Sequence, residues 1–322
     1  MTDDPRPSVL CTAPFAPDIM ARLDAAFAVQ RLADGLPPDI AATIRGLATN
    51  TLHGRLGADL MDRLPALEVI ANFGVGYDNI DVTAAAERGI VVTNTPGVLD
   101  EEVADLALAL LLATVRRLPQ AERHLREGKW PQGAFPLSPT LRGRRIGILG
   151  LGAIGKAIAR RLAGFDVDLA YNGRHRQPGV DLAYYPTAEA LAAAVDVLVV
   201  VVPGGAATAG MVDGAVLSAL GPQGILVNVA RGSVVDEPAL VAALQSGTIL
   251  GAGLDVFAHE PHVPPALLAL DNVVLLPHIG SASVATRSAM GNLMVDNLVS
   301  WFAVGHALTP VAETPQPSVR IR

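Results

Sequence analysis

Three residues with reactive side chains follow three predicted strands in the second half of the chain. Arg231 comes just after "GILVNVA", Glu260 follows "LGAGLDVF", and His278 follows "NVVLLP". Ligands of open parallel sheets bind at the carboxyl ends of the strands, so we expect these side chains to converge. An arginine can hold a substrate carboxylate, a histidine can protonate a carbonyl oxygen, and a glutamate can orient and charge that histidine. The three residues therefore indicate proton transfer to the carbonyl group of an anchored acid.

A glycine loop precedes these residues. The sequence "GLGAIG", Gly150 to Gly155, is a complete G-x-G-x-x-G between a predicted strand, "RRIGILG", and a predicted helix, "AIGKAIARRLAGF". Gly150 allows a tight turn, Gly152 lets the backbone approach a pyrophosphate, and Gly155 lets the helix pack against the strand. The helix N-terminus offers free N–H groups to the phosphates. This context predicts a dinucleotide site; the alternative is a glycine-rich turn without a ligand.

The end of the next predicted strand indicates which dinucleotide binds. Proteins that bind NAD usually carry an acidic residue there to hold the adenosine ribose, but "LAYNGRHRQ" reads Asn172, Gly173, Arg174, His175 and Arg176. The guanidinium of Arg174 can bind phosphate oxygens in a bidentate fork. We therefore predict a preference for NADPH, with NADH possible; the alternative is a solvated basic turn.

Short apolar runs alternate with helical patterns along the whole chain, which predicts parallel α/β sheets. Helices are expected at Ile19 to Val29, Ala58 to Leu64, Glu101 to Glu127 (after Asp100 as N-cap) and Ala285 to Val304. Six strand–helix repeats from "RRIGILG" onward predict a doubly wound Rossmann domain. We place it at residues 99–285, beside a smaller flavodoxin-like α/β substrate-binding domain at residues 1–98 and 286–322.

Composition excludes several classes of protein. The 322 residues are 51% apolar with a formal net charge of −7, which argues against a nucleic-acid-binding surface. The single cysteine, Cys11, offers neither a disulfide nor a metal cluster and reads as part of a strand. The apolar run from Val103 to Val115 is too short to span a membrane. With no secretory signal visible at the amino terminus, we expect a cytoplasmic protein without a membrane partner or a metal.

Several motifs in order carry a family resemblance. The chain resembles the D-isomer-specific 2-hydroxyacid dehydrogenases, and within that family it is most similar to the glyoxylate/hydroxypyruvate reductases. The resemblance covers nearly the whole chain. It rests on "NFGVGYDNID", "GIVVTNTPGVLDEEVADLALALLLATVRRL", "GILGLGAIGKAIARRL", "LVNVARGSVVDEPALVAAL", "GAGLDVFAHEP" and "LPHIGSAS".

The resemblance implies roles for individual residues. Arg231, Glu260 and His278 would be catalytic, with Glu260 favouring the charged imidazole of His278. Asp255 is expected near the nicotinamide ribose or carboxamide, with a turn cap as the alternative. The cofactor contacts would fall on Leu151, Gly152, Ala153, Ile154, Gly155, Gly173, Arg174, His175, Pro203, Thr208, Val229, Ala230, Arg231, Asp255, His278 and Gly280.

The substrate contacts implied by the resemblance come from both halves of the chain. Val75 and Gly76 would bind the substrate carboxylate through backbone N–H groups, and Leu52 would lie near the same pocket. Arg231 would orient the carbonyl group. His278, as an imidazolium, would protonate the alkoxide that forms when hydride reaches the 2-carbon of the oxo acid.

Substrate and assembly stay open at this stage. Glyoxylate and hydroxypyruvate are the first expectation, and hydroxyphenylpyruvate or another aromatic 2-oxo acid is the second. A different class is a dinucleotide-sensing corepressor, similar to the C-terminal binding proteins. The apolar helix from Val103 to Val115, taken with the resemblance, suggests a homodimer. The sequence leaves open whether a partner's loop around Trp130 to Phe135 completes the pocket.

Overall fold

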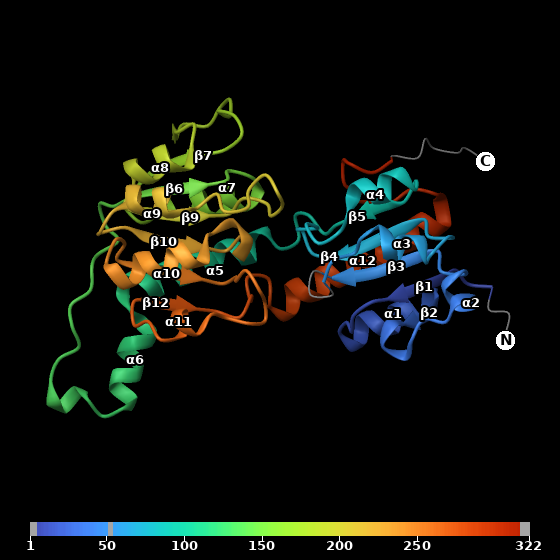
Figure 1. Cartoon of the computed structure of the whole chain (residues 1–322), viewed down its shortest axis with the longest axis horizontal. Coiled ribbons are helices and arrows are strands. Elements are labelled where there is room, and N and C mark those ends of the chain that lie inside the picture. The colour runs from blue at the N-terminus through green and yellow to red at the C-terminus, as the bar shows by residue number, and fades with distance from the viewer. Residues whose placement is uncertain (1–4, 51–53, 316–322) are drawn as a thin grey trace. The chain divides into compact units, whose positions relative to one another are not determined.

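Two parallel β-sheets form the frame of the chain (Figure 1). The structure, a computed structural model, describes residues 5–50 and 54–315. It divides into unit 1, which is residues 1–99 with 283–322, and unit 2, which is residues 100–282. The sequence predicts domain boundaries after residues 98 and 285. Each unit is described by itself below.

Unit 1 has a five-stranded sheet in the order β2-β1-β3-β4-β5, and all of its strand pairs are parallel. This is the flavodoxin-like order predicted for the smaller domain. Cys11 lies buried in the first strand, where burial raises the pKa of its thiol to about 11. The strands are β1 (Ser8–Cys11), β2 (Ala28–Arg31), β3 (Gly46–Asn50), β4 (Val69–Phe73) and β5 (Val91–Thr93).

A helix from the end of the chain completes unit 1. Met294, Val295 and Leu298 of α12 (Val284–Val304) share a buried apolar cluster with Leu23 of α1 (Pro17–Ala26). The two helices meet at Gly291, where a Cβ would lie 2.5 Å from Ile19. This close approach requires glycine at position 291. The chain thus returns to unit 1 through α12. The other helices of this unit are α2 (Pro38–Ala41), α3 (Ala58–Asp62) and α4 (Val82–Glu87), with the 3-10 turn η1 (Leu32–Asp34).

Unit 2 has a seven-stranded parallel sheet in the order β12-β11-β10-β9-β6-β7-β8. Counted from β6, this is the strand order of the Rossmann fold with one strand added, as the sequence predicts. The chain reverses direction across the sheet between β6 and β9, which places the glycine loop after β6 at the switch point. The strands are β6 (Arg145–Leu149), β7 (Asp168–Asn172), β8 (Ala183–Tyr184), β9 (Val197–Val200), β10 (Ile225–Asn228), β11 (Gly251–Leu254) and β12 (Val273–Leu275).

Local capping defines where several helices of unit 2 begin. The side chains of Thr187, Asp213 and Asp236 each accept a backbone N–H in the first turn that follows, a bond that satisfies otherwise unpaired donors. The helices are α5 (Asp100–Arg116), α6 (Leu118–Arg126), α7 (Ala153–Leu162), α8 (Ala188–Ala194), α9 (Gly214–Leu220), α10 (Glu237–Ser246) and α11 (Pro265–Leu268), with the 3-10 turns η3 (Trp130–Gln132) and η4 (Gly232–Val234).

The predicted helix from Glu101 to Glu127 is wrong as one element. Asp100 is the first residue of α5 instead of its N-cap, and α5 ends at Arg116. Arg117 has a left-handed φ of 53° and separates α5 from α6. Pro119 is the physical reason, because it has no N–H to donate to the carbonyl oxygen of Val115, four residues earlier, and its ring would clash with that group in a continuous helix.

Two short strands are missing from the prediction. The expected helix from Ile19 to Val29 ends earlier, at Ala26, and Val29 lies in β2. In unit 2 the two-residue strand β8 makes seven strands where the sequence indicates six. Both are edge strands, and such brief segments have too few residues to show an alternating pattern.

The search for membrane spans, over the described residues, finds no helix whose length and apolar content would let it cross a bilayer.

Candidate active site

The glycine loop forms an open cradle at the N-terminus of α7. Gly150 has a φ of +104°, a value that favours glycine, and a Cβ on Gly155 would lie 2.2 Å from the carbonyl oxygen of Gly150. A Cβ on Gly152 would instead meet no atom within 4 Å, and no side chain caps the helix there. The loop thus combines close packing on one side with free space on the other. The residues fit a dinucleotide pyrophosphate.

The remaining sequence-predicted cofactor residues lie past the carboxyl ends of strands in the same sheet. The hydroxyl of Thr208 donates to the carbonyl oxygen of Pro203 at 2.7 Å, which closes the loop after β9. The structure therefore brings these residues to one edge of unit 2. By strand they are Gly173, Arg174 and His175 after β7; Pro203 and Thr208 after β9; Val229, Ala230 and Arg231 after β10; Asp255 after β11; and His278 and Gly280 after β12.

The basic turn after β7 consists of Arg174, His175 and Arg176, whose side chains are exposed. Within residues 5–50 and 54–315, none of the three forms a side-chain hydrogen bond or an ion pair. The positive charges of Arg174 and Arg176 are therefore not neutralised by carboxylates of the described chain. Such a turn can accept an anionic group.

His278 and Glu260 form a close pair. Nδ1 of His278 lies 2.6 Å from Oε2 of Glu260, and the side chains are 31% and 21% exposed. Burial opposes ionisation of Glu260, but bonds from His278 and from the N–H of Phe257, with the charges of His278 and Arg231, hold the pKa of this carboxyl below its usual value. The pair thus occupies Nδ1 and leaves Nε2 as the nitrogen that can reach a substrate.

His278 also has an unusual backbone. Its φ of 53° lies in the left-handed region, which costs roughly 1–3 kcal/mol for such a residue and recurs at functional sites. Asp255 holds this conformation. Its carbonyl oxygen accepts the N–H of His278, and its carboxylate oxygens accept the N–H groups of Ile279 and Gly280, each at 2.8 Å.

Asp255 therefore acts first on the protein's own backbone. It is 1% exposed, and burial raises the pKa of its carboxyl despite the two backbone hydrogen bonds. The turn-holding alternative left open by the sequence describes these contacts. A direct contact with the cofactor stays a prediction.

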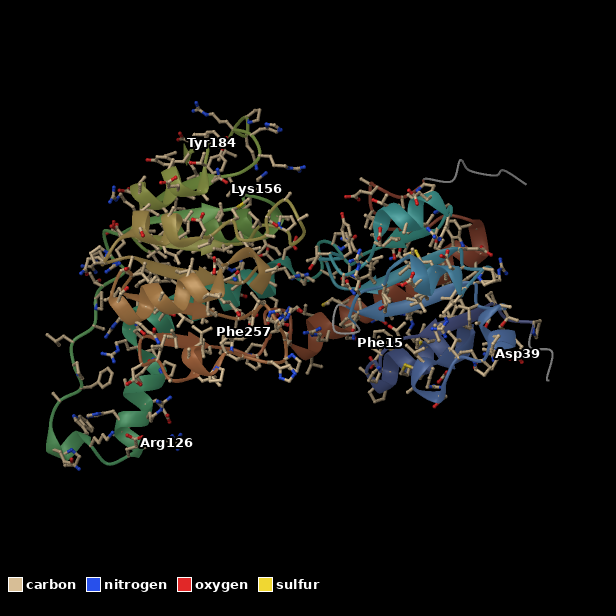
Figure 2. All side chains as sticks on the ribbon, in the orientation of Figure 1. Phe15, Asp39, Arg126, Lys156, Tyr184 and Phe257 are labelled. Atoms are coloured by element: carbon tan, nitrogen blue, oxygen red, sulfur yellow. The ribbon has the colours of Figure 1, made fainter. Side chains whose placement is uncertain are left out.

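Arg231 leaves the sheet through a turn held by Asn228. The side chain of Asn228 accepts the N–H of Ala230 and donates to the carbonyl oxygen of Arg231, both at 3.0 Å. The next residue, Gly232, packs so closely that a Cβ would lie 1.8 Å from the carbonyl carbon of Phe257. The segment that carries Arg231 is thus packed directly on the segment that leads to Glu260 (Figure 2 labels Phe257).

The predicted substrate loop lies in unit 1, after β4. The side chain of Asn72 donates to the carbonyl oxygens of Gly74 and Gly76 at 3.1 and 2.9 Å, and Asn94 donates to that of Val75 at 2.8 Å. All three carbonyl groups are therefore engaged. In the described part of the chain, the N–H groups of Val75 and Gly76 make no hydrogen bond. Leu52 lies outside the described residues.

Sequence reasoning missed the residues that hold these segments. Asn72, Asn94 and Asn228 each fix a loop that carries a predicted functional group. A signal was present, because each asparagine lies at or just past the end of a strand and short polar side chains there bond to nearby backbone. Asn72 and Asn228 act on residues two to four positions away, whereas Asn94 acts across 19 positions.

Comparison with known proteins decides the family. Residues 108–280 match the model of the D-isomer specific 2-hydroxyacid dehydrogenase NAD-binding domain. The chain belongs to the D-isomer-specific 2-hydroxyacid dehydrogenase family. It is an oxidoreductase of the glyoxylate reductase branch, and its cofactor is a nicotinamide dinucleotide.

Three relatives show how close the similarity is. An NADPH-dependent glyoxylate/hydroxypyruvate reductase from Sinorhizobium meliloti, solved with NADP and malonate, is 56% identical with a TM-score of 0.92, over 97% of this chain and 98% of that one. Glyoxylate/hydroxypyruvate reductase A of Arabidopsis thaliana is 48% identical over 269 residues, 84% of this chain and 86% of the relative. Hydroxyphenylpyruvate reductase of Plectranthus scutellarioides is 45% identical over 271 residues, with the same two shares.

These relatives are enzymes, so the corepressor alternative from the sequence is set aside in favour of a metabolic oxidoreductase.

Proposed function

We propose that this chain reduces glyoxylate and hydroxypyruvate to D-2-hydroxy acids with NADPH, and that His278 donates the proton. The observation that carries the proposal is the 2.6 Å contact between His278 and Glu260 in the same unit as the glycine loop. An imidazole held by a carboxylate at one nitrogen is a suitable general acid at the other.

The residues of the chain divide the remaining work. NADPH, when bound to the glycine loop, supplies the hydride. Nε2 of His278 donates a proton to the carbonyl oxygen as negative charge develops there, and Glu260 stabilises the imidazolium before that transfer. Arg231 binds the substrate carboxylate and so orients the carbonyl group.

The contacts of Val75 and Gly76 with the substrate stay a prediction. The free N–H groups of their loop are of the kind that binds a carboxylate.

The preference for NADPH over NADH rests on the basic turn. A 2′-phosphate would bring negative charge to Arg174, His175 and Arg176, whereas a free 2′-hydroxyl would not. The 56% identical relative from Sinorhizobium meliloti is NADPH-dependent and was solved with NADP, which supports the same assignment.

Steady-state kinetics test both parts of the proposal. Wild-type protein should oxidise NADPH in the presence of glyoxylate or hydroxypyruvate with a higher kcat/KM than NADH. Arg174→Ala should lower kcat/KM for NADPH about 10- to 100-fold, because a charge-assisted bond contributes about 1.5–3 kcal/mol, and leave the value for NADH nearly unchanged. A wild-type preference for NADH would overturn the cofactor assignment.

Aromatic 2-oxo acids are the second candidate substrates, because the hydroxyphenylpyruvate reductase is 45% identical. A panel of glyoxylate, hydroxypyruvate and hydroxyphenylpyruvate separates the two. The highest kcat/KM for hydroxyphenylpyruvate would replace the proposed substrate while retaining the mechanism.

We also propose that the protein is a homodimer whose partner loop reaches the pocket. The helix α6 and the segment after it extend away from the sheet of unit 2 (Figure 1), and α6 has no buried residue. Trp130 is 67% and Leu137 is 99% exposed, which is unusual for apolar side chains on one extended segment. Light scattering at micromolar concentration tests the mass, and a monomer would reject the assembly. A cytoplasmic location stays a prediction.

A further inference from the structure

The basic turn is attached to the rest of unit 2 at its beginning. The N–H of Gly150 donates to the carbonyl oxygen of Asn172 at 3.0 Å, which joins the glycine loop to the end of β7. The side chain of Asn172 then donates to the carbonyl oxygen of Tyr185 at 2.8 Å. These bonds fix where the turn starts, but none of them reaches Arg174, His175 or Arg176.

Gln177 attaches the turn at its other end. Its backbone N–H donates to the hydroxyl of Tyr171 at 2.7 Å, and its side-chain Nε2 donates to the carbonyl oxygen of Leu151 at 2.7 Å. Leu151 is the second residue of the glycine loop. One neutral side chain therefore joins the segment that carries the cations to the segment that cradles phosphates.

The acceptor for the backbone bond is firmly held. Tyr171 has no exposed surface, and its ring packs at 5.3 Å from that of Tyr184, which is labelled in Figure 2. After Gln177 the chain continues through Pro178, which has no N–H to donate, and Gly179, which has a left-handed φ of +74°. The chain thus turns away at once, and Gln177 is the last attachment before β8.

We propose that Gln177 is a positioning residue for recognition of the cofactor's 2′-phosphate. The inference rests on the proposed preference for NADPH. Within one dinucleotide, the pyrophosphate and the 2′-phosphate are joined by a single ribose, so the groups that bind them must keep a fixed spacing. The bond from Gln177 to Leu151 sets that spacing. Without it, the side chains of Arg174, His175 and Arg176 would have to be ordered at the moment of binding, and affinity for the 2′-phosphate would fall.

A positioning role for Gln177 and a purely structural role predict different effects of its substitution. Gln177 carries no charge and lies half-buried on a loop, so its loss should leave the apolar core intact. The loss should weaken only the part of binding that depends on the cations. NADPH and NADH share every other group, and the ratio of their kinetic constants isolates this part.

Gln177→Leu is the main test, because it removes the amide and keeps a side chain of similar size. We expect kcat/KM for NADPH to fall about tenfold through KM, with kcat and the value for NADH within about twofold of wild type, as the loss of one hydrogen bond allows. The inhibition constant of 2′,5′-ADP should rise by the same factor, and that of ADP should not. Gln245→Leu, an exposed glutamine on α10, is the matched control and should change neither value.

Tyr171→Phe provides a second variant that removes the acceptor of the backbone bond. It should reduce the NADPH to NADH ratio in the same direction, by a smaller factor. The positioning role is overturned if wild type prefers NADPH and both variants keep the wild-type ratio of kcat/KM for NADPH to that for NADH. An equal fall of kcat/KM for both cofactors keeps that ratio and has the same consequence. In either case the proposed function stands. If wild type shows no preference for NADPH, the proposed cofactor assignment fails before the variants are compared.

Discussion

Both units contain a doubly wound parallel sheet, yet the first crossing after the central strand differs between them. In unit 2, β6 leads through Gly150 and Gly152 into α7, with open space at Gly152 among the described residues. In unit 1, β1 leads through a segment that contains Phe15, whose ring packs 5.7 Å from that of Phe73, into a helix whose first residue is Pro17. Proline has no N–H, so it removes one of the donors that a phosphate would need. The two units share the sheet topology, but the residues of this crossing suit a phosphate in unit 2 and not in unit 1.

Unit 1 uses a different loop for its predicted contact. Asparagine side chains bind the carbonyl groups of the segment after β4. In the part of the chain that the structure describes, the N–H groups of Val75 and Gly76 remain without a hydrogen bond. Unit 2 thus combines the open glycine loop with the pair of His278 and Glu260, whereas the loop of unit 1 offers neutral backbone donors. Variants in unit 2 should therefore change cofactor binding and the rate of proton transfer. Variants in unit 1 should change the KM for the oxo acid.

The largest expected effect comes from removing the proposed proton donor of unit 2. His278→Ala should lower kcat for glyoxylate reduction about 100- to 10 000-fold, the usual contribution of a general acid. Binding of NADPH, measured by its fluorescence, should persist. Turnover close to that of wild type would reject His278 as the donor.

Crowding the glycine loop should have the next largest effect. Gly155→Ala places a methyl group 2.2 Å from the carbonyl oxygen of Gly150, and overpacking of this kind costs about 1–3 kcal/mol. We expect the dissociation constant of NADPH, measured by fluorescence titration, to rise about tenfold or more.

The matched control for this substitution lies in unit 1. Of the residues that the structure describes, a Cβ at Gly57 would have only Arg55 as a neighbour, at 3.9 Å, so Gly57→Ala should leave the dissociation constant unchanged. Equal weakening by both substitutions would contradict the contrast between the two units.

A smaller effect is expected from the loop of unit 1. Asn94→Ala removes the bond to the carbonyl oxygen of Val75, and the net contribution of one such bond is about 0.5–1.5 kcal/mol. The KM for glyoxylate should rise about two- to tenfold, while the KM for NADPH stays constant. A rise in the KM for NADPH with no change in the KM for glyoxylate would count against Val75 and Gly76 as substrate contacts.

The smallest expected effect concerns acid stability. The pKa of Glu260 lies below its ordinary value of 4.5 in the folded protein. Ionised Glu260 therefore stabilises the folded state above the unfolded pKa, and this contribution disappears as the pH falls through the folded pKa. Between pH 6 and pH 3 the melting temperature of wild type should fall further than that of Glu260→Gln. A steeper fall of the melting temperature for Glu260→Gln would show that ionised Glu260 does not stabilise the folded protein.

The sequence locates the glycine loop and the strand ends that carry the candidate residues more accurately than it locates the short elements around them. Gly150 to Gly155 and the strand ends at Arg231, Glu260 and His278 are local patterns, and the sheet order turns them into one edge. The break at Arg117 and the two-residue strand β8 depend on single residues or on pairing with a neighbour, so periodicity does not show them.

Contacts between distant residues were the least predictable part. The bond from Gln177 to Leu151 joins positions 26 apart, and the bonds from Asp255 to the loop after β12 span 24 and 25 positions. Each of these bonds depends on which strands become neighbours, and the residue types alone do not predict that pairing. The structure was needed to see that Asp255 holds the backbone that presents His278.

A crystal structure of the protein grown with NADP⁺ tests the central claim most directly. The account predicts the pyrophosphate at Gly152 to Gly155, the 2′-phosphate against Arg174, and the nicotinamide beside the imidazole of His278. A dinucleotide bound at the glycine loop with its nicotinamide remote from His278, or one bound elsewhere on the protein, would contradict it.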